Sequence, residues 1–422
     1  MRPRERGRVV WAWSARATPR GVGRPTRRLE RVRDVDVVVI GAGQAGLSAG
    51  FHLQHRGFVP VRRAVAGDRT FVILDAEKAA GGAWRHRWDS LTMATVNGIH
   101  ELPGYPVPEV DPRAPSREFL PGYFADYEEY FALDVLRPVR VREVRRGTPR
   151  PSPSPEGRLV VVTDTDTGAG ADTDTDTDAG ADTGTDTDTG TDTGAAWIAD
   201  HVINATGTWS RPFWPHYPGR ASFRGRQLHV HDYVSAAEFA GERVVIVGAG
   251  ISATQLLDEI SRVTDTFWVT RTPPEWSTDL SPEVLAAAVR GVEERVREGL
   301  PPQSVIRTTG MHRTPWVDAA DRRGALVRHP MFTRIEPDGV RMPDGTVEPA
   351  DVILWATGFR PAVAHLAPLG LRTAAGGIRV ADGRSVDEPR LFLIGYGPSQ
   401  STIGANRAGR DAVIAIVRES GR

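Results

Sequence analysis

The sequence has 422 residues, of which 40% are hydrophobic and 25% are charged, and its formal net charge at pH 7 is zero. At about 150 residues per domain, this length predicts two or three domains of ordinary globular composition. Cysteine is absent. That absence excludes disulfide scaffolds, thiolate metal sites, cysteine nucleophiles and redox-active dithiols.

Two oppositely charged segments cancel in the total. Residues 1–33 carry eleven Arg and two Glu, whereas residues 163–196 carry ten Asp and no basic residue. We interpret the first as a disordered basic leader, because it lacks the apolar stretch of a secretory signal. The second has no apolar period, which predicts a disordered insert. The remainder is nearly neutral, so we expect a cytoplasmic protein with no nucleic-acid partner and no membrane span.

In chain order, the first strongly patterned unit is an apolar strand at residues 35–40, a glycine-rich turn and a helix to about residue 55. Gly41 permits a tight turn, Gly43 lets the backbone approach a pyrophosphate, and Gly46 lets the helix pack on the strand. The helix start, at Gln44 and Ala45, offers free N–H groups to the phosphates. This unit predicts a bound dinucleotide.

An acidic residue is expected at the end of the second strand to hold the adenosine ribose. Asp75 follows the apolar run 71–74, further downstream than is usual, and the polar stretch 62–70 accounts for the excess as a loop insertion. Glu77 is the alternative candidate for this ribose-binding acid. The other alternative is that Asp75 is an ordinary carboxylate at the end of a strand. Further along, residues 158–162 and 197–203 read as two strands of a hairpin from which the acidic insert projects.

The second unit has a strand at residues 243–247, a turn containing Gly248 and Gly250, and a helix to about residue 261. The helix starts with Ile251, Ser252 and Ala253, and Ala253 replaces the third glycine, which the motif permits. The next strand, residues 266–270, ends in Arg271 rather than an acid. A guanidinium pairs with a 2′-phosphate, so we predict NADPH rather than NADH. A solvated strand-end arginine is the alternative.

Two such units imply two dinucleotides, and the redox partner of NADPH is most often a flavin. At these residues the sequence resembles the flavoproteins with two dinucleotide-binding domains. Gly82 and Trp84 resemble a Gly-Gly-x-Trp turn beside the flavin, and Gly395 and Ile403 resemble the last FAD-binding segment. The two crossings between the domains resemble those of the family at Ala205, Gly207, Thr357 and Gly358.

The resemblance implies an α/β fold with two Rossmann-like domains, in which the NADPH domain (208–350) is inserted into the FAD domain (34–207 and 351–422). A small β-meander would carry the disordered insert. Apolar runs at residues 352–355 and 391–394 are predicted as strands, and residues 282–299 and 403–417 as helices.

A more specific motif precedes the second unit. Phe223, Gly225, His229 and Tyr233 fit the FxGxxxHxxxY fingerprint of class B flavin monooxygenases, which the sequence therefore resembles. A metal site at His229 and His231 is the alternative, but further ligands at metal spacing are missing, so we expect no metal. The stretch 85–92 departs from that of Baeyer–Villiger enzymes, and Asn97 is the candidate for the residue near the flavin C4a position in flavin-containing monooxygenases.

This resemblance implies an enzyme that binds FAD and NADPH and inserts one atom of O2 into a small nucleophilic substrate through a C4a-hydroperoxyflavin. The resemblance favours nitrogen or sulfur over a ketone as the target. Two alternatives stay open. One is an NADPH-dependent flavoprotein reductase without oxygen insertion, and the other is a nucleotide-binding redox sensor. A homodimer also stays open.

Overall fold

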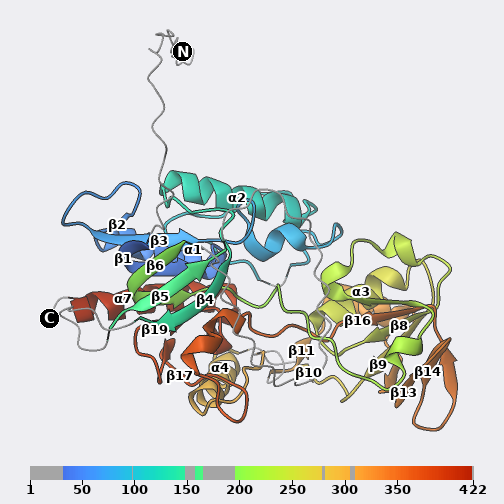
Figure 1. Cartoon of the computed structure of the whole chain (residues 1–422). Helices are drawn as coiled ribbons and strands as arrows, with labels where there is room; N and C mark the ends of the chain where they lie inside the picture. Colours follow the sequence, from blue (N-terminus) through green and yellow to red (C-terminus); the bar gives the residue numbers. More distant parts are fainter. Residues whose placement is uncertain are drawn as a thin grey trace, which may run out of the picture.

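The structure is a computed structural model that describes residues 32–96, 98–147, 157–164, 195–277, 281–304 and 309–420. Two large sheets with separate cores dominate the described chain (Figure 1), and two small sheets, of two strands (β10-β11) and three strands (β13-β14-β15), accompany them. Residues 1–31 of the predicted basic leader and most of the predicted acidic insert lie outside the described residues, so these predictions stay untested there. The last two residues of the predicted leader, Val32 and Arg33, are not disordered but begin strand β1.

The first sheet has nine described strands, in the order β17-β18-β19-β6-β1-β3-β2, with β5 paired to β6 and β4 to β5. At its centre β1 runs parallel to β3 and β6, with Val39 aligned to Ile73 and to Ile203. The predicted hairpin is confirmed, since β5 and β6 pair antiparallel and β4 completes the meander. The strands are β1 Val32–Ile40, β2 Phe58–Pro60, β3 Arg69–Leu74, β4 Val141–Arg146, β5 Leu159–Thr163, β6 Ala196–Asn204, β17 Val380–Ala381, β18 Arg384–Ser385 and β19 Leu391–Leu393.

Helices cover one face of this sheet, and the meander lies on the other. One core cluster joins the sheet to the helices α1 (Gln44–His55), α2 (Ser116–Tyr130) and α7 (Thr402–Ser420). A Cβ atom on Gly409 would lie 2.8 Å from Ser48 Oγ, so the small residue lets α7 approach α1 closely. On the opposite face a second cluster joins the sheet to the meander, to the 3-10 helix η5 (Ala364–Leu369) and to α4 (Pro282–Arg297).

The second sheet consists of five described parallel strands in the order β12-β9-β8-β16-β7. Its central strands β8 and β16 are fully buried, as their uninterrupted apolar sequences require in a sheet covered on both faces. Helices α3 and α6 pack together beside it, and a three-stranded antiparallel sheet covers part of the other face.

The elements of this part are β7 Arg226–His229, β8 Val244–Val247, α3 Ile251–Ile260, β9 Thr266–Thr270, β10 Trp276–Ser277, β11 Met311–His312, α6 Pro315–Arg322, β12 Arg328–Pro330, β13 Arg334–Glu336, β14 Gly339–Arg341, β15 Val347–Pro349 and β16 Val352–Trp355. Short 3-10 helices complete the described chain: η1 Gly82–His86, η2 Arg220–Ser222, η3 Val230–Asp232, η4 Ala236–Phe239 and η6 Gly397–Gln400. Among the described helices, none combines the length and the apolar character needed to cross a bilayer.

The predicted α/β class with parallel sheets is confirmed, and the second sheet lies in sequence between strands of the first. Two boundaries differ from our prediction. The strand β16, which we placed in the second part of the FAD domain, pairs with β7 and β8 in the second sheet, so the crossing follows this strand. Helix α4, which we placed in the NADPH domain, buries Val296 in a core cluster of the first sheet. An amphipathic helix does not reveal from its own sequence which core it joins.

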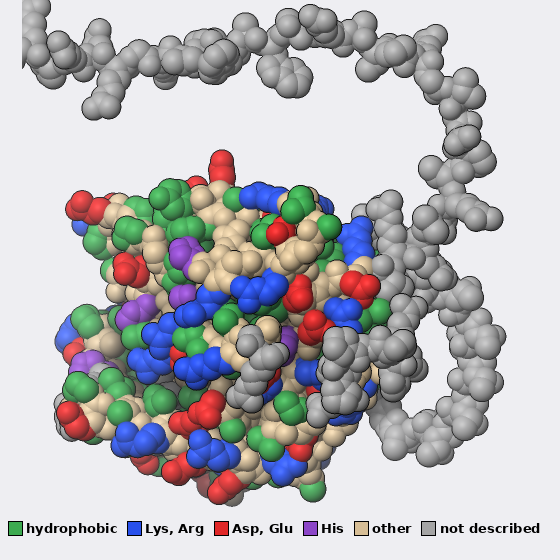
Figure 2. All heavy atoms as spheres, turned by 90° about the vertical axis from the view of Figure 1, so that its left-hand side faces the viewer, with side chains coloured by type: hydrophobic (Ala, Val, Ile, Leu, Met, Phe, Trp, Pro, Cys, Tyr) green, Lys and Arg blue, Asp and Glu red, His purple; other side chains and the backbone are tan. Residues whose placement is uncertain are grey.

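Figure 2 shows the face at the left of Figure 1, where acidic and basic side chains are interspersed and a group of basic ones lies near the middle. Ion pairs fasten the C-terminal helix α7 to strand β18 of the first sheet. Both oxygens of Glu419, at the end of α7, accept from Arg384 of β18, at 2.5 and 2.8 Å. Burial acts to raise the pKa of Glu419, but hydrogen bonds from Arg384 and His201 outweigh burial, and the pKa is lowered. This carboxylate therefore stays ionised and holds α7 in place.

The position of α4 gives a test of the packing on the first sheet. We expect Val296→Asp to lower the free energy of unfolding by about 3 kcal/mol or more, because it buries a charge in the core. The matched control is Leu285→Asp on the same helix, where the side chain is 40% exposed. Thermal unfolding of both variants measures the difference. Equal melting temperatures for the two variants would show that α4 does not pack on this core.

Candidate functional site

The first glycine turn joins the end of β1 to the start of α1. Gly41 has φ +97°, and a Cβ atom there would lie 2.8 Å from the carbonyl oxygen of Ala205. A Cβ atom on Gly46 would lie 1.8 Å from the carbonyl oxygen of Gly41, so any side chain would push the helix off the turn. Around the Cβ position of Gly43, by contrast, nothing lies within 4 Å. The turn is thus tightly closed on two sides and open where a phosphate would approach.

Residues from distant parts of the sequence complete the surroundings of this turn. A Cβ atom on Gly82 would lie 3.3 Å from Gly43 Cα, which places the Gly-Gly-x-Trp turn directly against the phosphate turn. Gln44, which begins α1 ahead of Ala45, donates from Nε2 to Asn406 Oδ1 on α7 at 2.9 Å. The described residues fit FAD here, because the N-terminus of α1 and an open glycine provide the N–H groups and the space that a pyrophosphate needs.

Asp75 directly follows β3, and the first glycine lies beside it, since Gly41 N–H donates to the carbonyl oxygen of Leu74. The buried carboxylate of Asp75 accepts a hydrogen bond at Oδ2 from Arg137 Nε, at 2.7 Å. Arg137 also makes a bidentate pair with Glu128. Burial raises the pKa of Glu128, although Arg137 opposes the shift. Sequence reasoning missed Arg137, because nothing in its local sequence indicates a partner 62 residues away, and with it Glu128, the second partner of Arg137.

The remaining residues predicted for the FAD side lie around the first crossing. Ala205 follows β6 and donates from its N–H to Ile40 at the end of β1. Gly207 and Gly395 face each other, since a Cβ atom on Gly395 would lie 3.9 Å from Gly207 Cα. Ile403 is the second residue of α7 and is 48% exposed. Asn97, the candidate near the flavin, lies outside the described residues, so its predicted role stays untested.

The second glycine turn repeats the geometry of the first between β8 and α3. A Cβ atom on Gly248, which has φ +141°, would lie 2.2 Å from the carbonyl oxygen of Ala356, and the Cβ position of Gly250 is open. Ile251 and Ser252 begin α3, and Ala253 is fully buried against the sheet. The permitted alanine therefore takes the packing position of the third glycine.

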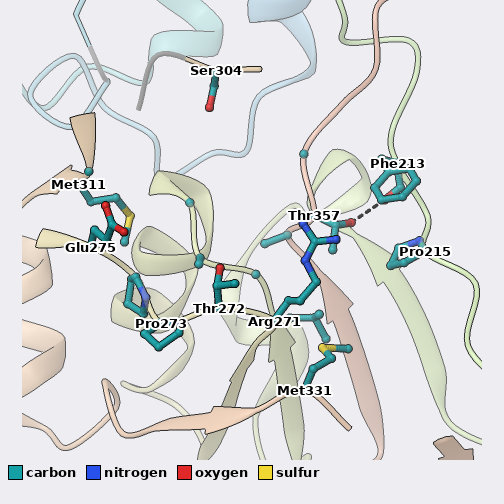
Figure 3. A pocket seen from close by; sticks show the side chains of 18 of the residues that line it. Phe213, Pro215, Arg271, Thr272, Pro273, Glu275, Ser304, Met311, Met331 and Thr357 are labelled. Carbon is teal, nitrogen blue, oxygen red and sulfur yellow. Dashed lines mark hydrogen bonds between the residues drawn. The ribbon is translucent and has the colours of Figure 1, made fainter. Parts of the chain in front are cut away.

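A cavity of about 740 Å³ opens beside the second turn (Figure 3). Arg271 follows β9 and projects into it toward Thr357, whose hydroxyl donates to the carbonyl oxygen of Phe213. No ion pair or hydrogen bond joins the Arg271 side chain to a residue in the described part of the chain. The lining comes from six regions of the sequence: Phe213, Pro215, Tyr217, Val247, Gly248, Ala249, Gly250, Arg271, Thr272, Pro273, Pro274, Glu275, Ser304, Gly310, Met311, Met331, Ala356, Thr357 and Gly358. A cation without a partner in such a cavity fits a 2′-phosphate.

The fingerprint residues connect this sheet to the second crossing. A Cβ atom on Gly225 would lie 2.2 Å from the carbonyl oxygen of Asp351, and Phe223 packs over the same glycine. His229 ends β7 and is fully buried. Its Nδ1 accepts from the N–H of His231 at 3.0 Å, which leaves the ring proton on Nε2 to be donated to the carbonyl oxygen of Gly358 at 3.1 Å. Burial lowers the pKa of His229 to about 4, so the ring is neutral at neutral pH.

Tyr233 brings a carboxylate into the seam between the two sheets. Its hydroxyl donates to Glu259 Oε2 on α3 at 2.8 Å, and Ser90 donates to the same oxygen at 2.5 Å. Trp88 Nε1 donates to the other oxygen at 3.1 Å. Nearby, Gln255 Nε2 donates to the carbonyl oxygen of Thr95 at 2.9 Å. Sequence reasoning missed Glu259 and Gln255, whose partners from the loop after η1 are 160 or more residues away.

Aromatic residues gather where the two crossings meet. The ring centroid of Trp209 lies 4.9 Å from those of both Phe359 and His231. Trp84 packs against core clusters of both sheets. We call Trp84, Arg87, Trp209, His231 and Phe359 the junction cluster. Trp84 ends the Gly-Gly-x-Trp turn and Arg87 follows it, and Trp209 and Phe359 follow the two crossings, so the cluster joins segments from both sheets.

This arrangement is the one expected of an oxidoreductase that binds two nucleotides. A family model described as flavin-binding monooxygenase-like matches residues 35–281, and one described as pyridine nucleotide-disulphide oxidoreductase matches residues 185–395. The chain belongs to the flavin-binding monooxygenase-like family, because that model covers more than half of its length. The absence of cysteine from the sequence excludes dithiol chemistry and leaves the second match as one of fold.

Several known proteins are similar to this chain. A flavin-containing monooxygenase from Stenotrophomonas maltophilia is 35% identical, covers 92% of this chain and 100% of its own, and superposes with a TM-score of 0.70. Indole-3-pyruvate monooxygenase YUCCA4 from Oryza sativa subsp. japonica is 26% identical over 386 residues, which is 83% of this chain and 80% of that protein. An uncharacterized CzcO-like oxidoreductase from Geobacillus kaustophilus is 26% identical over 228 residues. That match spans 54% of this chain and about half, 51%, of the relative.

These similarities confirm the predicted family, the flavin monooxygenase class and the flavin and pyridine-nucleotide cofactors FAD and NADPH. The roles of the individual residues stay predictions. Their placement agrees with two sites of the expected kind, since each glycine turn and its helix start lie together.

The first turn gives a direct test. We expect Gly46→Ala to weaken FAD binding more than about tenfold, because its Cβ atom would lie 1.8 Å from the Gly41 carbonyl oxygen and would displace the helix start. Gly122→Ala in α2 is the matched control, since nothing lies within 4 Å of its Cβ position. The ratio of flavin to protein absorbance after purification measures the effect. A Gly46→Ala protein that retains the wild-type flavin content would contradict the assigned turn.

Proposed function

We propose that this protein oxidises NADPH and places one oxygen atom from O2 on a nitrogen or sulfur atom of a small substrate. The second oxygen atom leaves as water. NADPH supplies two electrons, so that substrate, O2, NADPH and one proton give oxygenated substrate, NADP⁺ and water.

The observation that carries this proposal is the link between the cavity beside Arg271 and the junction cluster. One short segment serves both: Thr357 and Gly358 line the cavity, and the next residue is Phe359 of the junction cluster. Neutral His229 holds this segment through the Gly358 carbonyl oxygen. A nucleotide in the cavity would therefore have its reactive end directed toward the first site.

Bound FAD supplies the redox chemistry of this reaction, namely acceptance of a hydride from NADPH and activation of O2. The residues described here bind and orient. Arg137 occupies Oδ2 of Asp75, which leaves Oδ1 to accept from a ribose hydroxyl. The free N–H groups at the start of α1 would hold the pyrophosphate, and Arg271 would pair with the 2′-phosphate of NADPH. The rings of Trp84, Trp209 and Phe359 would exclude water from the junction.

The preference for nitrogen or sulfur over a ketone rests on the loop that follows the Gly-Gly-x-Trp turn. Residues 85–92 differ from the stretch that ester-forming Baeyer–Villiger enzymes share at this place. In the structure this loop is used for attachment, because Trp88 and Ser90 both donate to Glu259 of the second sheet.

Isotope incorporation tests the activity. We expect the purified holoenzyme with NADPH and ¹⁸O2 to convert methyl phenyl sulfide to its sulfoxide or N,N-dimethylaniline to its N-oxide, with one ¹⁸O atom per product. Product mass and NADPH consumption in equal amounts are the measurement, and cyclohexanone is the comparison substrate. NADPH oxidation that yields only hydrogen peroxide with a broad set of amines and thioethers would establish the reductase alternative instead.

Arg271 determines the choice of nicotinamide nucleotide in this proposal. We expect Arg271→Gln to raise KM for NADPH about 10- to 100-fold, the range for loss of a charge-assisted hydrogen bond, and to leave KM for NADH unchanged. Arg297→Gln is a control, since that arginine pairs with Glu293 on α4. Steady-state NADPH and NADH oxidation by the variants gives the result. Equal changes for both nucleotides would remove Arg271 from phosphate recognition.

A further inference from the structure

Arg87 is a cation without a counter-ion inside the junction cluster. It directly follows η1, and its Cζ atom lies 4.2 Å from the ring centroid of Trp209 and 5.3 Å from that of Trp84. Its Nε is buried and has no hydrogen-bond partner. The side chain forms no ion pair with any residue in the described ranges. Burial lowers the pKa of Arg87 to about 10, so the guanidinium remains charged at neutral pH.

A second orphan donor lies beside it. The indole Nε1 of Trp209 is also buried without a hydrogen-bond partner. Leaving such a donor unsatisfied costs about 1–3 kcal/mol, and more for a charged group, so native structures rarely retain two together without a reason. One arginine stacked on one tryptophan, each with a free N–H group, matches an anionic ligand that accepts hydrogen bonds from both.

In the proposed assignment the phosphates of the cofactors have other partners. The first glycine turn and the start of α1 would hold one pyrophosphate, and the second turn with Arg271 would hold the other nucleotide. Arg87 belongs to neither group. It lies with Trp84, which packs on core clusters of both sheets, and with Trp209, whose ring stacks on Phe359. The ligand still unaccounted for at this position is the molecule to be oxygenated.

We propose that Arg87 and the indole N–H of Trp209 bind a carboxylate on the substrate, and that the substrate class is therefore small acids that carry a thioether or amine. This assignment rests on the proposed function. The oxygen transfer forms a bond between one atom of O2 and the sulfur or nitrogen lone pair. The other atom leaves as water with the two electrons of NADPH, and the carboxylate takes no part beyond binding.

A matched pair of compounds tests the charge requirement. We expect wild-type holoenzyme to oxygenate (methylthio)acetate with a kcat/KM at least tenfold above that for its methyl ester, which lacks the charge. Arg87→Met should lower kcat/KM for the acid about 10- to 100-fold and leave that for the ester within twofold. Arg85→Met is the control on the same 3-10 helix, because Arg85 donates to the Ala79 carbonyl oxygen and lies outside the junction cluster.

Binding without turnover gives an independent measurement. Calorimetric titration of (methylthio)acetate into holoenzyme with oxidised FAD and NADP⁺ should yield a dissociation constant that rises at least tenfold in Arg87→Met. Trp209→Phe preserves a ring beneath the guanidinium but removes the indole N–H, and it should weaken binding about three- to tenfold. Arg85→Met should bind as the wild type does.

Three results would overturn this assignment. The first is equal use of acid and ester by the wild type. The second is an Arg87→Met variant that binds the acid normally. The third is an Arg87→Met variant whose main defect is lost flavin or a higher KM for NADPH, because Arg87 would then serve a cofactor. Absence of product from both compounds and from all neutral amines and thioethers would instead refute the proposed function, and with it the substrate class.

Discussion

The carbonyl oxygens of two alanines set the geometry of the whole molecule. Ala205 and Ala356 each begin an Ala-Thr-Gly crossing, and each carbonyl oxygen lies where a Cβ atom of the first turn glycine would be, at 2.8 Å for Gly41 and 2.2 Å for Gly248. Only glycine permits so close an approach with a positive φ. Because the same contact recurs in both halves, each crossing must pass over a nucleotide turn, and the residues after the crossings are brought to a common junction.

The fingerprint residues hold the second crossing in place at that junction. Gly225 lets the chain approach Asp351 beside β16, and buried His229 then reaches the Gly358 carbonyl oxygen in the crossing that follows β16. Its ring accepts at one nitrogen and donates at the other, so a second proton would break the bond to the N–H of His231. Tyr233 extends the connection to Glu259, which also holds the loop after η1. These side chains position the two sheets and need not touch the reacting atoms.

Local patterns predicted the parts of the site that a short segment determines by itself. A buried strand, a glycine turn and a helix start are adjacent in sequence, and so are β9 and Arg271. Residues whose partners are remote could not be predicted. Trp88 meets Glu259 across 171 positions, and Val296 of α4 joins the core of the first sheet rather than the second. The pairing of β16 with β7 and β8 likewise depends on tertiary contacts, so the boundary expected at residue 350 came too early.

Arginines that pair with carboxylates hold the fold together, whereas arginines without such a partner are candidates for binding a ligand. Arg137 lies between Asp75 and Glu128, and Arg390 and Arg146 both pair with the buried Glu388, so each of these arginines has a carboxylate partner. Arg87 and Arg271 have no such carboxylate among the described residues, although both are close to aromatic or cavity-lining groups that could have been replaced by an acid. Leaving the half-buried Arg87 unpaired is unfavourable for the apoprotein, and an anionic ligand there would supply the missing partner. Arg271 is exposed in the lining of the cavity, where water solvates its charge until a phosphate takes that place.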